Sequence, residues 1–135
     1  MLRAYLKNLW HRSAEANNRN LARLLEKNPQ ARFLDLGCDD GQLVKERLEK
    51  WVGTQDIYGV DIDKKVLSEA KKRGLKVFDQ DLNHQKLPFK SNFFDVVQAN
   101  QVIEHLWDTD TFLGEVFRVL KPGGYLVIST ENLSS

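Results

Sequence analysis

The stretch of sequence best suited to chemistry is a glycine-bounded turn that carries acidic side chains. It lies between a short apolar run and a helical pattern, and it reads Gly37, Cys38, Asp39, Asp40 and Gly41. Glycine has no Cβ, so the chain can bend sharply at such a turn and a ligand can approach the backbone closely. The helix start behind it adds free N–H groups and the positive end of a helix dipole. The turn is therefore predicted to bind a small ligand.

Polar side chains also follow the next three apolar runs of the sequence. Asp61 follows the second run, Asp81 follows the third and Asn100 follows the fourth. An ionised carboxylate only accepts hydrogen bonds, so an acid about 20 residues after a glycine turn suits the two hydroxyls of a ribose. Asp81 suits the exocyclic amine of adenine, and Ile62 and Leu82 can sandwich a flat base. The predicted ligand is an adenosine-bearing cofactor.

The carboxylates of the turn discriminate between two classes of such cofactors. A dinucleotide-binding fingerprint reads G-x-G-x-x-G, and its glycines let a pyrophosphate lie on the helix start. Here the middle glycine is missing, and Asp39 and Asp40 would repel a pyrophosphate. These side chains favour a cofactor that is cationic near the turn. A nicotinamide-dependent oxidoreductase is the disfavoured alternative.

The turn and the strand-end acids need a sheet that brings them together. Short apolar runs without alternation, separated by helical patterns, are typical of a parallel sheet that is covered on both faces. Right-handed crossovers then give a doubly wound α/β sheet with its ligand at the carboxyl ends of the strands. The predicted strands cover residues 31–37, 56–61, 75–78, 93–99 and 125–129. The predicted helices cover residues 42–51, capped by Asp40, the stretch between the cap Asp63 and the stop Gly74, and residues 110–120.

Composition and charge limit the possible function classes. The chain has 135 residues, of which 41% are hydrophobic and 29% charged, and its formal net charge is +1. This length suits one domain with one core, and the charge gives no global attraction to nucleic acid or to a membrane surface. No apolar run approaches the ~20 residues of a membrane span. The lone cysteine, Cys38, excludes an internal disulfide framework and a cysteine-based zinc cage, so a reducing, cytoplasmic location is predicted.

Residues 1–30 are predicted to form an N-terminal helical segment. Apolar side chains recur at helical spacing from Leu2 to Trp10, and Asn28-Pro29 should end the helical pattern that follows. The aromatic face can pack on the core or cover a pocket as a lid, and packing is the simpler interpretation. The segment is rich in arginine and poor in acids, as mitochondrial presequences are, but an ordinary helix pair explains it more simply. Residues 31–135 are the predicted ligand-binding domain.

Six segments of the chain, taken in order, resemble a known family. They are Leu34-Asp35-Leu36-Gly37-Cys38-x-x-Gly41, Gly59-Val60-Asp61-Ile62, Asp81-Leu82 before Leu87-Pro88-Phe89, Phe94-Asp95-Val96-Val97, Val102-Ile103-Glu104-His105-Leu106, and Arg118-Val119-Leu120-Lys121-Pro122-Gly123-Gly124. Together they resemble the class I S-adenosylmethionine-dependent methyltransferases. The last three segments look most like the small-molecule branch that includes quinone O-methyltransferases. The resemblance implies a Rossmann-like methyltransferase fold with strand order 3-2-1-4-5.

The resemblance also implies how S-adenosyl-L-methionine would be held. The glycine turn would carry the methionine part, with Asp35 organising the turn and its bound water. Asp61 would hold the ribose diol, and Asp81 with the Leu82 main chain would read the adenine edge. The Asn100 carbonyl would face the methionine amino group. The implied cofactor-binding residues are thus Asp35, Gly37, Cys38, Asp39, Gly41, Asp61, Ile62, Asp81, Leu82 and Asn100. One departure stands out, because the family usually has glycine where this chain has Asp39.

The implied reaction is transfer of a methyl group to a small-molecule acceptor, at oxygen or carbon. His105 is the motif residue whose pKa suits a general base near neutrality, and the alternative is that Glu104 and His105 only orient their loop. Residues 101–105 also resemble the metal-binding segment of small-RNA 2′-O-methyltransferases. Gln101 replaces the glutamate of that segment and is a poor ligand for a hard cation, so no metal is predicted.

The chain ends at Ser135, just after the last predicted strand. The resembling fold continues with an antiparallel pair that covers this strand, so a methyltransferase core truncated after strand five is expected. Residues 125–128 would form an apolar edge that needs cover from a further segment or from a partner chain. Together with Asp39, this end leaves a second interpretation open: a non-catalytic cofactor-binding protein or partner subunit.

Overall fold

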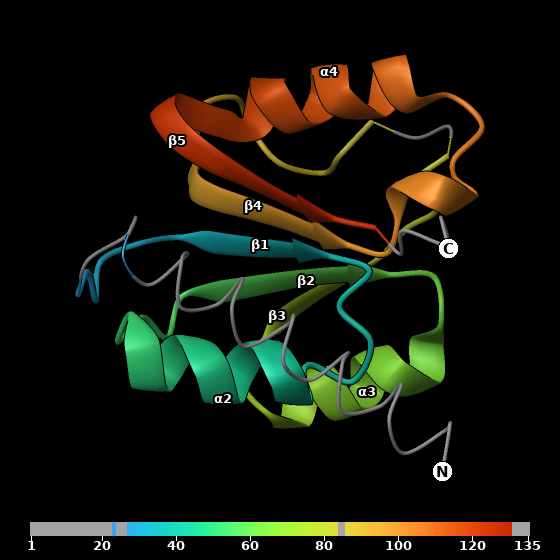
Figure 1. Cartoon of the computed structure of the whole chain (residues 1–135). Coiled ribbons are helices and arrows are strands. Elements are labelled where there is room, and N and C mark those ends of the chain that lie inside the picture. Colours follow the sequence, from blue (N-terminus) through green and yellow to red (C-terminus); the bar gives the residue numbers. More distant parts are fainter. Residues whose placement is uncertain (1–22, 24–26, 84–85, 131–135) are drawn as a thin grey trace, which may run out of the picture.

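Five parallel strands form a sheet at the centre of the molecule (Figure 1). In this computed structural model, residues 23, 27–83 and 86–130 are described, so the predicted N-terminal helices lie outside the described residues. The order of the strands across the sheet is β3-β2-β1-β4-β5, which confirms the predicted order. The strands are β1 (Phe33–Leu36), β2 (Ile57–Asp61), β3 (Lys76–Asp79), β4 (Phe94–Asn100) and β5 (Leu120–Ser129).

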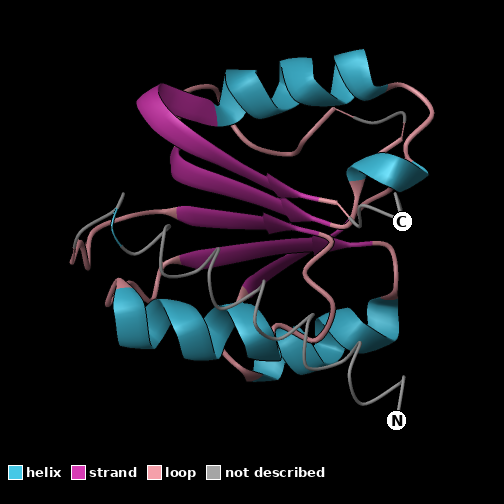
Figure 2. Ribbon diagram, in the orientation of Figure 1, coloured by secondary structure: helices cyan, strands magenta, loops and turns pink. Residues whose placement is uncertain are grey.

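Helices cover both faces of the sheet, as a doubly wound fold requires (Figure 2). Helices α2 (Gln42–Trp51) and α3 (Lys64–Lys72) lie on one face, and α4 (Thr109–Val119) lies on the other. A short 3₁₀ helix, η1 (Ile103–His105), follows β4 at the carboxyl edge of the sheet. Among the described residues, no helix is both long enough and apolar enough to cross a membrane.

The two faces of the sheet have separate cores that meet at β1. All four residues of β1 are buried, because this central strand is covered on both sides. Phe33 packs with the α2 and α3 side chains, whereas Leu34 packs with those of α4. Burying a side chain of this size contributes roughly 1.5–3 kcal/mol. The sheet is therefore a firm platform for the polar groups at its carboxyl edge.

The helix starts agree with the predictions at α3 and differ at α2. Asp63 caps α3 as predicted, because its carboxylate accepts a hydrogen bond from the Lys65 N–H at 2.9 Å. At α2 the predicted cap was wrong by one residue: Gly41 is the N-cap, with φ of 75°. Asp40 still accepts a hydrogen bond from the Gln42 N–H at 3.0 Å. The left-handed glycine turns the chain so that the preceding carboxylate reaches the first turn of the helix.

Strand β5 begins five residues earlier than predicted. Phe94 pairs with Leu120 and Val96 pairs with Tyr125, with a shift of register between these pairs. The Pro122-Gly123-Gly124 segment lies inside β5 at this shift of register, where a proline without an N–H is tolerated. At the far end of the strand, Tyr125 and Ile128 are 40% and 37% exposed. A cover for this edge stays a prediction.

A clamp around Arg118 ties α4 to the loop that enters β4. The guanidinium donates to the Phe89 carbonyl at 2.7 Å and to the Leu87 carbonyl at 3.0 Å. It also pairs with Glu115 at 2.6 Å, and Glu115 in turn accepts from the Leu87 N–H at 2.8 Å. We call these four residues the Arg118 clamp. Phe89 is held by it against the ring of Phe94, 4.9 Å away between centroids.

Candidate functional site

The glycine turn between β1 and α2 is tied to the end of β2. The N–H groups of Gly37 and Cys38 donate to the Val60 carbonyl at 2.8 and 3.0 Å. Gly37 has φ of 74°, and a Cβ added there would lie 2.8 Å from Val102. A Cβ added at Gly59 would lie 2.6 Å from the sulfur of Cys38, which is buried between the turn and the sheet. The close approach of turn and strand therefore requires glycine on both sides.

Asp39 occupies a backbone conformation that favours glycine. Its φ is 51°, in the left-handed region, and its N–H donates to Asp61 at 3.0 Å. Aspartate adopts this region more readily than most residues, but glycine does so without steric cost. Asp39 therefore carries backbone strain that a glycine at this position would not carry.

Replacing Asp39 with glycine should raise the free energy of unfolding by about 0.5–1 kcal/mol, because it relieves the left-handed strain and removes one of several clustered carboxylates. The measurement is urea unfolding of the two chains at neutral pH. Asp39→Asn is the matched control, since asparagine keeps the left-handed tolerance and removes only the charge. A glycine variant less stable than the wild type would show that the Asp39 side chain supports the turn.

Asp35 is a buried carboxyl group in the middle of β1. It is 6% exposed, and its Oδ1 atom has no hydrogen-bond partner among the described residues. Burial, and secondarily the charge of Asp61, holds the pKa of Asp35 well above its usual range. A buried carboxyl without a partner destabilises the fold unless a ligand supplies a donor or a cation. Asp35 is therefore placed to receive one.

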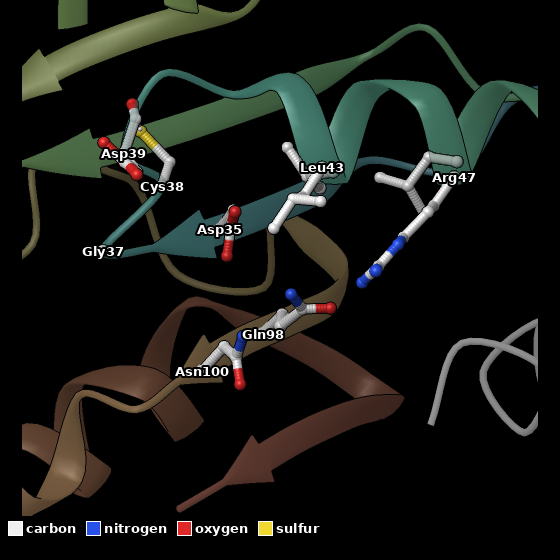
Figure 3. A pocket seen from close by; sticks show the side chains of 10 residues that line it. Asp35, Gly37, Cys38, Asp39, Leu43, Arg47, Gln98 and Asn100 are labelled. Carbon is white, nitrogen blue, oxygen red and sulfur yellow. Dashed lines mark hydrogen bonds between the residues drawn. The ribbon is translucent and has the colours of Figure 1, made fainter. Parts of the chain in front are cut away.

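A pocket of about 200 Å³ lies beside Asp35, between α2 and the strands β1 and β4 (Figure 3). We call it the Asp35 pocket. Its lining residues are Asp35, Gly37, Cys38, Asp39, Leu43, Val44, Arg47, Leu48, Gln98 and Asn100. Four of the predicted site residues other than Gly37 thus share this space: Asp35, Cys38, Asp39 and Asn100.

A second pocket of about 260 Å³ lies on the other side of Gly37, and we call it the Asp61 pocket. Gly37 lines both pockets, so the turn separates them. The lining residues of this second pocket are Gly37, Asp61, Ile62, Gln80, Asp81, Leu82, Asn83, Gln101, Val102, His105 and Leu106. The predicted ribose and adenine residues therefore lie together, and the predicted base His105 lies on the same wall.

Main-chain hydrogen bonds hold the acids of the Asp61 pocket in place. The two oxygens of Asp61 accept from the N–H groups of Asp39 and Asp63, each at 3.0 Å. Asp81 accepts from the Asn83 N–H at 2.9 Å through one oxygen. Each carboxylate oxygen has two lone-pair sites, so both side chains keep capacity for a ligand's hydroxyl or amine. Their orientation is set before any ligand arrives.

Gly41 does not line either pocket. A Cβ added there would lie 3.0–3.2 Å from Leu75 and Ala70, so Gly41 lets α2 start close to α3 and β3. Its predicted contact with a cofactor stays a prediction. Among the described residues, no three histidine, cysteine, aspartate or glutamate side chains gather as a metal site.

The prediction missed Arg47 and Gln98 in the Asp35 pocket. Gln98 could have been found, because it lies two residues before Asn100 on β4 and strand side chains alternate between faces. Arg47 lies four residues after Leu43, on the same helix face. Neither spacing indicates that these faces border a pocket.

Comparison with known proteins gives the family of this fold. A family model described as a methyltransferase domain matches residues 34–128. A "Probable S-adenosylmethionine-dependent methyltransferase" of Mycolicibacterium smegmatis is 33% identical over 129 residues, which are 93% of this chain and 47% of the relative. A ubiquinone biosynthesis O-methyltransferase of a Bradyrhizobium strain is 34% identical over 110 residues, which are 75% of this chain and 40% of the relative.

The solved structures agree with this match. The crystal structure of an S-adenosylmethionine-dependent methyltransferase from Mesorhizobium loti superposes with a TM-score of 0.70 and 27% identity, over 84% of this chain and 52% of that one. The chain thus spans about half the length of the proteins it matches. Since the family model matches most of the chain, the chain belongs to the class I S-adenosylmethionine-dependent methyltransferases.

Proposed function

We propose that this chain forms the cofactor-binding part of an enzyme that transfers a methyl group from S-adenosyl-L-methionine to a small molecule, at oxygen or carbon. The observation that carries the proposal is the pair of pockets that share Gly37. One contains a buried carboxyl with an oxygen that has no partner among the described residues, and the other contains two oriented acids. S-adenosyl-L-methionine consists of an amino acid part and an adenosine part joined at the sulfur atom. Two pockets that meet at Gly37 can each hold one of these parts.

The residues present fit this cofactor. In the Asp61 pocket, Asp61 would accept hydrogen bonds from the ribose hydroxyls, and Asp81 would accept one from the adenine amine. Ile62, which is 65% exposed, and Leu82 would cover the two faces of the base. Burial of such an exposed apolar side chain by a flat ring is favourable. In the Asp35 pocket, Asp35 would attract the positively charged end of the methionine part.

In this mechanism the chain itself positions the methyl donor and the acceptor, and it can take up a proton. S-adenosyl-L-methionine supplies a methyl group that its sulfonium already activates for displacement. The glycine turn fixes the position of the donor, and alignment of donor and acceptor accounts for much of the rate in such transfers. His105 is exposed on the wall of the Asp61 pocket, where it could take a proton from an acceptor hydroxyl at its free ring nitrogen.

Relatives named as ubiquinone or menaquinone biosynthesis methyltransferases, one acting at oxygen and two at carbon, support a quinone-like acceptor that is methylated at oxygen or carbon. A non-catalytic cofactor-binding subunit is the second candidate, favoured by the aspartate that replaces the family's glycine at position 39. Cofactor binding is common to both candidates. Methyl transfer by the chain to a phenolic or quinol acceptor would distinguish them. A cytoplasmic location stays a prediction.

Binding of the cofactor can be tested at Asp61. Isothermal titration should give binding of S-adenosylmethionine and S-adenosylhomocysteine and none of NAD. Asp61→Ala should weaken the binding of both by about 100-fold or more, because each hydrogen bond to a charged group contributes about 1.5–3 kcal/mol. Asp110→Ala, on the exposed start of α4, is the control and should bind as the wild type does. Unchanged affinity after Asp61→Ala would contradict the ribose assignment.

A further inference from the structure

Arg47 lies on the wall of the Asp35 pocket, two turns along α2 from its N-cap. It is half-buried, and the neighbouring pocket residues Leu43, Val44 and Leu48 belong to the same helix. Figure 3 shows its guanidinium extending from α2 toward Gln98 on β4, across from Asp35. The helix therefore places a guanidinium beside the pocket.

The Arg47 guanidinium forms no ion pair or hydrogen bond with another side chain of the described residues. Three other described arginines differ, because Arg32, Arg73 and Arg118 pair with Asp56, Asp40 and Glu115 at 3.5, 3.6 and 2.6 Å. Asp35 in the same pocket also has an oxygen without a partner. Two groups of opposite charge thus border one pocket without neutralising each other.

The wall between them supplies hydrogen-bond donors. Gln98 and Asn100 lie on the same face of β4, and their side-chain amides line the pocket. The carbonyl oxygen of the Asn100 amide accepts from the Ser129 hydroxyl, which leaves the NH₂ group of this amide as a donor. An acceptor group close to Arg47 would therefore find neutral donors as well as the guanidinium.

From this arrangement we infer that Arg47 binds the α-carboxylate of the cofactor's methionine part, while Asp35 receives its α-ammonium group. The inference rests on the proposed cofactor and adds the residue that selects for an intact amino acid. A guanidinium fork suits a carboxylate because it can donate two parallel hydrogen bonds. A pocket with a carboxyl at one side and a guanidinium at the other matches a zwitterion in both charge and direction.

The test compares three ligands that differ in the amino acid part. S-adenosylhomocysteine carries both charged groups, its decarboxylated form lacks only the carboxylate, and methylthioadenosine lacks both; all three are thioethers without a charge on sulfur. In titrations at neutral pH, Arg47→Ala should weaken the binding of S-adenosylhomocysteine about 10- to 100-fold, as expected for loss of a charge-assisted pair. The same variant should bind the other two ligands as the wild type does. Arg47→Lys should recover part of the loss.

Lys50→Ala is the matched control, because it removes a positive charge from the same helix at a position that does not line the pocket. It should leave all three affinities unchanged. If Arg47→Ala bound S-adenosylhomocysteine as tightly as the wild type, or lost all three ligands equally, the inference would be overturned. Failure of the wild type to bind S-adenosylhomocysteine at all would instead contradict the proposed function.

Discussion

Replacing Asp35 with asparagine should stabilise the chain and weaken its binding of S-adenosylmethionine. Asp35 is buried, and one of its oxygens has no partner among the described residues. Asparagine has nearly the same shape and carries no charge to desolvate. We expect the free energy of unfolding at pH 7 to rise by about 1–3 kcal/mol, because burying a neutral amide costs less than burying a carboxylate without a partner. Urea unfolding without ligand measures this change.

The pH dependence of the free energy of unfolding shows whether ionisation of Asp35 stabilises or destabilises the folded chain. The pKa of Asp35 is raised in the folded chain, so the folded state binds more protons than the unfolded state between the two pKa values. Stability of the wild type should therefore fall as pH rises from about 3.9, the ordinary value for aspartate, through the raised pKa. The Asp35→Asn chain should lack this fall. A parallel pH profile for both chains would show that Asp35 is not the cause.

The same substitution should weaken the binding of S-adenosylmethionine about 10- to 100-fold, since the ligand's positive charge loses a buried carboxylate partner. Asp110→Asn, at the exposed start of α4, should change neither stability nor affinity. A more stable variant that binds as tightly as the wild type would mean that the Asp35 pocket does not receive the methionine part.

The largest loss of stability is expected from Arg118→Ala. This change removes the ion pair to Glu115 and leaves the carbonyl groups of Leu87 and Phe89 without their donor. Removing one partner of a partly buried pair, together with the donor of two carbonyl groups, costs about 1–3 kcal/mol, which is a sizeable part of the 5–15 kcal/mol that stabilises an ordinary domain. Thermal and urea unfolding should both show it.

Arg118→Lys tests whether the shape of the guanidinium matters. Lysine keeps the charge but cannot donate to Glu115 and both carbonyls in one plane, so an intermediate stability is expected. A lysine variant as stable as the wild type would show that charge alone holds the clamp. If Arg118→Lys were as unstable as Arg118→Ala, the whole stabilising effect of Arg118 would come from the geometry of its guanidinium.

Glu115 adds a pH signature to the clamp. Its pKa is lowered, first by the hydrogen bond from Arg118. Its contribution to stability is therefore present above about 4.3, the ordinary value for glutamate, and is lost as pH falls through the lowered pKa. The Arg118→Ala chain should lose less stability over this acid range than the wild type. An equally steep loss would place the acid sensitivity elsewhere in the chain.

Much of the fold was accessible from the sequence because local signals agreed with tertiary packing. The apolar runs predicted the five strands, the resemblance to the methyltransferase family implied their order, and Asp63 and Gly74 indicated the ends of α3. The start of β5 was wrong because Pro-Gly-Gly normally ends regular structure. Here β5 continues through this segment, and its extra residues form an irregularity opposite Phe94 and Val96 of β4. Pairing with β4 depends on residues far away in the sequence, so it cannot be predicted from the Pro-Gly-Gly segment alone.

The candidate site was accessible in part for the same reason. Side chains at strand ends, such as Asp61 and Asp81, come together in any parallel sheet, so their grouping followed from topology. Arg47 belongs to a helix, and its place beside Asp35 depends on how α2 crosses the sheet. The hydrogen bond from the Asp39 N–H to Asp61 could not be predicted either, because it depends on the left-handed turn at Asp39.

The contact between Cys38 and Gly59 makes the turn observable in solution. Cys38 is the chain's lone cysteine, it is 5% exposed, and burial raises the pKa of its thiol. The thiolate is the nucleophile that attacks a thiol reagent, so Cys38 can be labelled only when the turn lifts away from β2 and exposes the sulfur. The labelling rate of the native chain therefore reports how often the turn opens. A cofactor bound across the turn would lower this labelling rate in proportion to its occupancy.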